Sequence, residues 1–150
     1  MPERTFELAL VDDDASIVRI VEHIIAAHLS EFYAVTKFTD SRAARDWLEQ
    51  HACDVLISDV EMPGIGGSEL LRIGKRRNSG MQAVFLTAHS SWDRIAEAIE
   101  TGVNDYLLKP VDQAGLVRVL RHAHERLLQR QDAEISSNGL DDARQPVPVG

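Results

Sequence analysis

The sequence has 150 residues, of which 44% are hydrophobic and 27% are charged, and it contains a single cysteine. This composition is typical of one globular domain that buries a hydrophobic core without disulfide bonds. The formal net charge of −8 argues against direct binding of nucleic acid, which needs clustered cations. The sequence has no apolar run long enough to span a membrane and no secretory signal, so we expect a cytoplasmic protein without membrane contact.

Five short apolar runs alternate with five amphipathic stretches along the chain. In chain order, the runs cover residues 6–11, 33–38, 55–58, 83–87 and 105–108. Each run has the length of a β-strand, and the stretches carry apolar residues at helical spacing, as Ile17, Val21 and Ile24 do. Strands joined by helical crossovers lie parallel, and right-handed crossovers place helices on both faces of the sheet. The pattern therefore predicts a doubly wound α/β fold with five parallel strands and five helices.

Cap residues and composition set the expected limits of these elements. Ser41 and Asp112 are expected to cap the second and fifth helices, and Gly102 is expected to end the fourth. After residue 129 the helical pattern gives way to Ser, Asn, Gly, Asp and Pro, which is typical of a disordered segment. We therefore predict one folded domain over residues 1–129 and a disordered tail or linker over residues 130–150.

Several conspicuous residues are expected to have structural rather than chemical roles. Cys53, beside an apolar run, is expected to be a packed small residue. A basic run is expected to face solvent; it consists of Arg72, Lys75, Arg76 and Arg77. Five histidines lack the spacing of metal ligands and are expected at the surface, namely His23, His28, His51, His122 and His124.

Polar residues interrupt the apolar pattern at the carboxyl ends of the predicted strands. Asp12 and Asp13 follow the first strand, and Asp59 follows the third. Thr87 ends the fourth strand and Lys109 follows the fifth. An Asp after a strand is more often a helix cap than a functional group, but these residues share one edge of the sheet, where parallel sheets bind ligands. We therefore expect them to converge on one site.

Four segments that contain these residues resemble the receiver domain of bacterial two-component response regulators. The segments are residues 10–14 (LVDDD), 56–64 (LISDVEMPG), 85–88 (FLTA) and 106–110 (YLLKP), and the resemblance covers residues 6 to about 129. It implies a flavodoxin-like receiver fold with strand order 2-1-3-4-5. It also implies that a histidine kinase phosphorylates Asp59 and that Mg²⁺ is the required metal. Gly66 departs from the family, which commonly carries an Asp there.

The resemblance also implies the residues that hold the metal. Asp13 and Asp59 would bind Mg²⁺ directly, Asp12 through water and Glu61 through its backbone carbonyl. The residue types make chemical sense, because three carboxylates held together repel one another unless a hard cation binds between them.

The remaining site residues are assigned to the phosphoryl group and the switch. Thr87 and Lys109 would contact phosphoryl oxygens, and Ala88 lies where side chains tune the lifetime of the phosphoryl group. Tyr106 would be the rotamer switch, and Pro110 would follow a cis peptide bond that aligns Lys109. The product would be an acyl phosphate, which hydrolyses readily and therefore suits a transient signal.

We therefore expect a phosphoacceptor signalling switch rather than an enzyme. Its expected partners are a sensor histidine kinase or phosphotransfer protein, a downstream protein target, and a second copy bound through the fourth helix, fifth strand and fifth helix. One alternative is a receiver that docks without phosphorylation. Another is a Mg²⁺-dependent phosphatase with an aspartate nucleophile, although such enzymes place the nucleophile after the first strand. A flavodoxin-like cofactor binder is disfavoured because no phosphate-binding loop follows the first strand.

Overall fold

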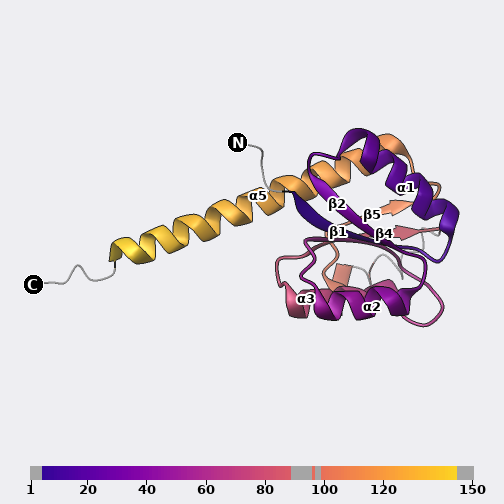
Figure 1. Cartoon of the computed structure of the whole chain (residues 1–150), viewed down its shortest axis with the longest axis horizontal. Coiled ribbons are helices and arrows are strands. Elements are labelled where there is room, and N and C mark those ends of the chain that lie inside the picture. Colours follow the sequence, from indigo (N-terminus) through magenta and orange to yellow (C-terminus); the bar gives the residue numbers. More distant parts are fainter. Residues whose placement is uncertain (1–4, 89–95, 97–98, 145–150) are drawn as a thin grey trace, which may run out of the picture.

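Five strands form one parallel sheet in the order β2-β1-β3-β4-β5 (Figure 1). The computed structural model describes residues 5–88, 96 and 99–144, and side chains up to residue 134. The strands are β1 (Phe6–Val11), β2 (Tyr33–Phe38), β3 (Val55–Asp59), β4 (Gln82–Thr87) and β5 (Asp105–Leu108). The predicted strands agree with these bounds to within one residue, and the strand order implied by the resemblance is confirmed.

Helices cover both faces of the sheet. They are α1 (Ala15–His28), α2 (Ser41–Gln50), α3 (Gly67–Arg77) and α5 (Gln113–Arg144). In Figure 1, α1 and α5 lie on one side of the sheet, and α2 and α3 lie on the other. The predicted fourth helix falls largely outside the described residues, but residue 96 and residues 99–101 are helical. Its predicted end is confirmed at Gly102, which has a φ of 94° that favours glycine.

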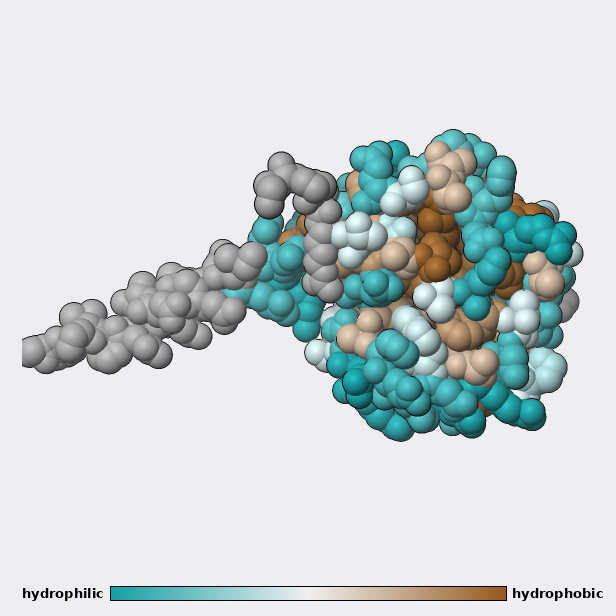
Figure 2. Space-filling view, viewed as in Figure 1, coloured by the Kyte–Doolittle hydropathy of each residue, from teal (hydrophilic) through white to brown (hydrophobic). Residues whose placement is uncertain are grey.

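Alternate residues of the central strands supply two hydrophobic cores. Leu8 and Leu10 of β1 pack into the core beneath α1 and α5. Ala9 and Val11 pack into the core above α2 and α3. Because the central strands are buried on both faces, their sequences are continuous apolar runs, which is why the sequence indicated them clearly. The edge strand β2 is less buried, and Figure 2 shows hydrophobic residues at the centre of the visible face, where Figure 1 places β2.

The helix caps differ in part from the prediction. Asp112 caps α5 as predicted, because its carboxylate accepts bonds from the Ala114 and Gly115 amides. Ser41 does not cap α2. The cap is Asp40, whose carboxylate accepts a bond of 3.0 Å from the Arg42 amide. Both residue types are good N-caps, so adjacent candidates are difficult to distinguish from sequence.

The last helix is longer than predicted. We expected a disordered tail from residue 130, whereas α5 continues to Arg144 and extends away from the sheet (Figure 1). All of residues 129–134 except Asp132 are good helix formers, and a helix can continue beyond the core without an apolar face. Near this point Arg130 donates a bond of 3.3 Å to the Ser79 hydroxyl. Residues 145–150 lie outside the described residues.

The surface location predicted for His124 is wrong. Its side chain is buried on the inner face of α5, and its ring centroid lies 4.2 Å from that of Phe32. The ring also makes edge contacts with Phe6 and Tyr33. His122 is exposed, as predicted, because it lies two positions before His124 and therefore on the opposite side of the helix.

Cys53 is buried as predicted, and burial raises the pKa of its thiol to about 12.

The basic run on α3 does more than face solvent. The guanidinium of Arg77 donates bonds of 3.1 Å to the Glu49 and Gln50 carbonyls, which end α2. Lys75 Nζ lies 3.4 Å from the Gly102 carbonyl oxygen. Arg77 therefore satisfies backbone acceptors at a helix terminus.

Among the described residues, no helix combines the length and apolar character needed to cross a membrane.

Candidate functional site

The predicted site residues do converge at the carboxyl edge of the sheet. Asp12 follows β1, Asp59 ends β3 and Thr87 ends β4. The Lys109 amide, just after β5, donates a bond of 2.8 Å to the Thr87 carbonyl. The neighbouring strands β1, β3, β4 and β5 therefore place these residues along a single edge of the sheet. This edge includes the ends of β1 and β3, where the strand order reverses and parallel sheets commonly bind ligands.

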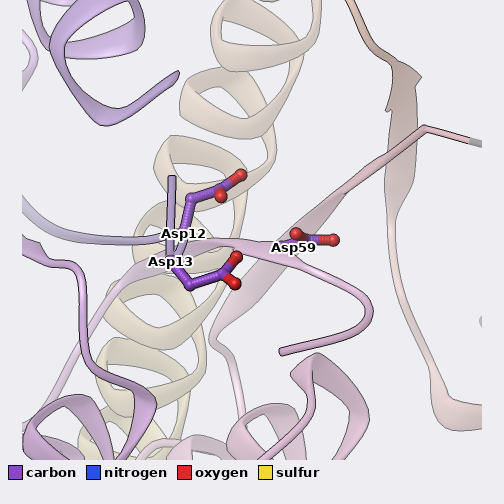
Figure 3. Close-up of side chains that lie close together, drawn as sticks. All are labelled: Asp12, Asp13 and Asp59. Atoms are coloured by element: carbon purple, nitrogen blue, oxygen red, sulfur yellow. The ribbon is translucent and has the colours of Figure 1, made fainter. Parts of the chain in front are cut away.

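Three carboxylates form the centre of the site. Asp12, Asp13 and Asp59 each offer an oxygen, and these oxygens all lie within 4.8 Å of one another. Figure 3 shows the side chains of Asp12 and Asp13 extending from the end of β1 on the side where Asp59 lies. Asp12 is fully buried, Asp59 is partly buried and Asp13 is exposed. The cluster is thus anchored inside the protein and open to solvent on one side.

Lys109 is the cation of this cluster. Its Nζ lies 2.8 Å from Asp12 Oδ2 and 3.1 Å from Asp59 Oδ2. Burial raises the pKa of Asp12, and the bond from Lys109 only partly offsets that effect. Burial alone would lower the pKa of Lys109, but its bonds to Asp12 and Asp59 outweigh burial and raise that pKa. Lys109 therefore stays charged at neutral pH.

Backbone amides fix the carboxylates of Asp12 and Asp59. Asp12 Oδ1 accepts a bond of 2.9 Å from the Asp14 amide, while Asp14 itself caps α1 through the Ser16 amide. Asp59 Oδ1 lies 3.3 Å from the Glu61 amide nitrogen. These bonds leave the carboxylates little rotational freedom, which suits a preorganised binding site.

The cluster fits a hard divalent cation. Its donors are carboxylate oxygens, which are the ligands that Mg²⁺ and Ca²⁺ prefer. One ammonium faces three carboxylates, and Asp13 has no ion pair among the described residues, so negative charge remains to be neutralised. The donor set is therefore consistent with the Mg²⁺ that the resemblance implies.

The other predicted residues lie on β4, on β5 and in the segments that follow β3, β4 and β5. Thr87 is buried, whereas Glu61 and Ala88 are exposed. Tyr106 is 39% exposed, so its ring lies at the surface of β5. The Lys109-Pro110 peptide bond is cis, as the resemblance implied. The next residue after Ala88, His89, lies outside the described residues.

Gly67, which was not among the predicted site residues, also shapes the site. A Cβ atom on Gly67, the first residue of α3, would lie 2.6 Å from the Asp59 carbonyl oxygen. A glycine at this position therefore lets the start of α3 approach the end of β3. The Gly66-Gly67 pair in the sequence indicates a place where the backbone can pack closely. The pair alone does not show which other segment of the backbone packs against it.

The sequence has clear relatives of known class. Residues 8–121 match the response regulator receiver domain. The chain is 34% identical over 134 residues to the DNA-binding transcriptional regulator NtrC of Escherichia coli (strain K12), covering 87% of this chain and 27% of that protein. It is 37% identical over 114 residues to the two-component response regulator ARR18 of Arabidopsis thaliana, covering 75% of this chain and 17% of that protein. The chain thus spans about a quarter or less of these relatives.

Solved structures show the same fold. The chain superposes on the receiver domain of AraT, a response regulator from Geobacillus stearothermophilus, with a TM-score of 0.77 and 27% identity, covering 85% of this chain and 99% of that one. A CheY-like receiver domain protein from Methanospirillum hungatei JF-1 gives a TM-score of 0.73 at 21% identity, covering 84% and 99%. Family match, relatives and fold agree, and the chain belongs to the response regulator receiver domains of two-component systems.

Proposed function

We propose that this chain is a phosphorylation switch in which Asp59 accepts a phosphoryl group from a sensor histidine kinase or a phosphotransfer protein. The observation that carries the proposal is the contact of Lys109 with Asp59 and Asp12, at the edge where three carboxylates gather. A carboxylate attacks phosphorus only when the repulsion between the two anionic groups is neutralised. Membership of the receiver family supports the same role.

The acidic cluster is the proposed Mg²⁺ site. Asp13 and Asp59 would bind the ion directly, Asp12 through water and Glu61 through its backbone carbonyl oxygen. Bound Mg²⁺ would supply positive charge close to the phosphoryl oxygens, as divalent cations do in phosphoryl transfer. Asp12 is well placed for an indirect contact, because its carboxylate already bonds to Lys109 and to the Asp14 amide.

The protein residues have distinct tasks in the transfer. An oxygen of Asp59 forms a bond to phosphorus as the bond between phosphorus and the donor nitrogen breaks, and the electron pair remains on the donor's histidine ring. Lys109 keeps its proton and neutralises a phosphoryl oxygen, while the Thr87 hydroxyl donates a hydrogen bond to another. Water later hydrolyses the acyl phosphate, and the small, exposed side chain of Ala88 leaves room for that water.

The switch would connect Thr87 to Tyr106. In the register of β4 and β5, Phe85 pairs with Tyr106 and Thr87 pairs with Leu108, so these four residues share one face of the sheet. Movement of Thr87 towards the phosphoryl group would vacate space that the Tyr106 ring can fill. Reversing a two-state population takes about 5 kcal/mol, and two charge-assisted hydrogen bonds supply most of it at about 1.5 to 3 kcal/mol each.

The same face offers a surface for partners. Three of the four large hydrophobic residues that are exposed among the described residues are Tyr106 and Leu108, which lie on β5, and Ile99, which lies in the helical residues 99–101 that precede it. We infer that a downstream protein or a second copy of the chain binds there after phosphorylation.

The DNA binding named for NtrC is not assigned to this chain, which has a net charge of −8 and spans 27% of that protein. The proposed location is the cytoplasm, where two-component kinases phosphorylate their regulators.

Binding of beryllofluoride, an analogue of the phosphoryl group, tests the proposed site. With Mg²⁺ present, beryllofluoride is expected to shift the amide NMR signals of Thr87 and Tyr106 in the wild-type protein. The shifts should vanish without Mg²⁺ and in Asp59→Asn. Identical spectra with and without beryllofluoride in the wild-type protein would refute the proposed function.

A further inference from the structure

Ser41 connects α2 to the loop that joins β3 and α3. Its side chain is 2% exposed, and its hydroxyl makes two hydrogen bonds to the backbone of that loop. The hydroxyl donates to the Pro63 carbonyl at 3.0 Å and accepts from the Ile65 amide at 3.1 Å. Because Asp40 already caps α2, the Ser41 hydroxyl is available to hold the loop.

The loop needs this support at its tip. Its base is fixed by two backbone bonds, from the Val60 amide to Leu86 and from the Gly67 amide to Val60. The tip contains Gly64, with a φ of 91°, and Gly66, the N-cap residue before α3, which has no side chain to cap the helix. Glycines lower the cost of local opening, so an external hydrogen-bonding group at the tip restricts the loop effectively.

We propose that Ser41 is a positioning residue for the metal site. Glu61, whose backbone carbonyl is the proposed metal ligand in the loop, lies two residues before Pro63. By fixing Pro63 and Ile65, Ser41 holds that carbonyl in the place that the ion requires. This inference rests on the proposed function, because it presupposes that Mg²⁺ binds at the acidic cluster. Groups that orient metal ligands indirectly influence metal affinity strongly.

The test compares Mg²⁺ affinity in two variants that each lose two hydrogen bonds between a side chain and the backbone. Ser41→Ala removes the hydroxyl with little change in volume. Asn78→Ala is the control, because Asn78 also bridges two backbone groups, Cys53 at 2.9 Å and Gly80 at 3.1 Å. Asn78 lies at the end of α3 that is remote from Asp59. Calorimetric titration is expected to show Mg²⁺ binding weakened about tenfold in Ser41→Ala and unchanged in Asn78→Ala.

The outcomes separate this inference from the proposed function. Absence of Mg²⁺ binding in the wild-type protein would refute the proposed function and the inference with it. Wild-type binding that Ser41→Ala leaves unchanged, or that both variants weaken equally, would refute the inference alone.

Hydrogen exchange provides a second measurement that needs no variant. Because coupling between two sites is reciprocal, Mg²⁺ should strengthen the bond between Ser41 and the Ile65 amide if that bond supports the metal site. Exchange of the Ile65 amide in the wild-type protein is therefore expected to slow several-fold when Mg²⁺ is added. An unchanged exchange rate at Ile65 in protein that binds Mg²⁺ would overturn the proposal.

Discussion

Lys109 balances two carboxylates that differ in burial. Asp12 is fully buried, and its main cationic partner is Lys109, whose side chain is 17% exposed. A buried charge that loses its partner is costly, since neither water nor another cation replaces the lost contact. The stability of the metal-free protein therefore depends on a residue that the proposed function also requires for chemistry.

Substitution of Lys109 tests this double role. Lys109→Met is expected to lower the free energy of unfolding by about 2 to 3 kcal/mol without Mg²⁺, because it leaves Asp12 unpaired. The control is Lys37→Met, which removes an exposed pair with Glu22 and should cost less than about 1 kcal/mol. Urea unfolding in the presence of a chelator measures both values. Equal effects of the two substitutions would contradict the structural role of Lys109.

Cys53 makes the protein sensitive to alkali. Burial raises the pKa of its thiol from 9.0 to about 12, so the folded state favours the neutral thiol. Its contribution to stability is complete below pH 9 and is lost as the pH rises towards 12. Between pH 7 and pH 10.5, urea unfolding of the wild-type protein should lose about 2 kcal/mol more than Cys53→Ala does. An equal loss of unfolding free energy in the two proteins between pH 7 and pH 10.5 would show that the Cys53 thiol does not cause the sensitivity to alkali.

Residue identities predicted some of these features better than others. Asp12, Asp59, Thr87 and Lys109 could be placed together because a parallel sheet brings its carboxyl ends to one edge. The burial of His124 could not be predicted, since histidine occurs on either side of a helix and its aromatic neighbours are distant in sequence.

At the scale of elements, strands were easier to predict than helix ends. Burial on both faces gives the central strands an unmistakable apolar run, and the predicted bounds were correct to within one residue. The predicted end of α5 was wrong, because the part of a helix that extends beyond the core needs no apolar face and so leaves no apolar pattern in the sequence. The predicted N-cap of α2 was wrong by one residue, because Asp40 and Ser41 are both suitable N-cap residues. Only the tertiary contacts of Ser41 distinguish them.

Arg77 bridges the carboxyl ends of α2 and α3. Its guanidinium bonds to two carbonyl groups at the end of α2, whereas the neighbouring Arg76 is exposed and makes no such bond in the described structure. Arg77→Ala is expected to lower the free energy of unfolding by about 1 kcal/mol, and Arg76→Ala by less than about 0.5 kcal/mol. Chemical denaturation distinguishes these values. A loss in Arg76→Ala as large as that in Arg77→Ala would contradict the capping role.

At the scale of the whole molecule, the chemistry and the exposed hydrophobic residues meet at β5. Lys109 follows this strand and contacts Asp59, while Tyr106 and Leu108 expose their side chains from it. A change at the proposed phosphorylation site can therefore reach the surface across a single strand. This arrangement could be anticipated from the family resemblance, but the exposure of Leu108 required the structure.

Self-association is the expected consequence of phosphorylation. Sedimentation velocity should show that Mg²⁺ and beryllofluoride shift the wild-type protein from monomer to dimer. Leu108→Ser should abolish the shift, because it removes a hydrophobic side chain from the proposed interface. Ile20→Ser is the control, since Ile20 is equally hydrophobic and 47% exposed but lies on α1. Sedimentation unaffected by beryllofluoride in all three proteins would contradict a dimer through β5.

Phosphorylation of Asp59 itself is tested most directly by intact-mass spectrometry after incubation with acetyl phosphate. Wild-type protein with Mg²⁺ is expected to gain one phosphoryl group, and a chelator should prevent the gain. Asp59→Asn should remain unmodified, whereas Asp54→Asn, which changes a buried aspartate just before β3, should be phosphorylated like the wild type. Failure of the wild-type protein to gain a phosphoryl group, or equal gain in Asp59→Asn, would contradict the role assigned to Asp59.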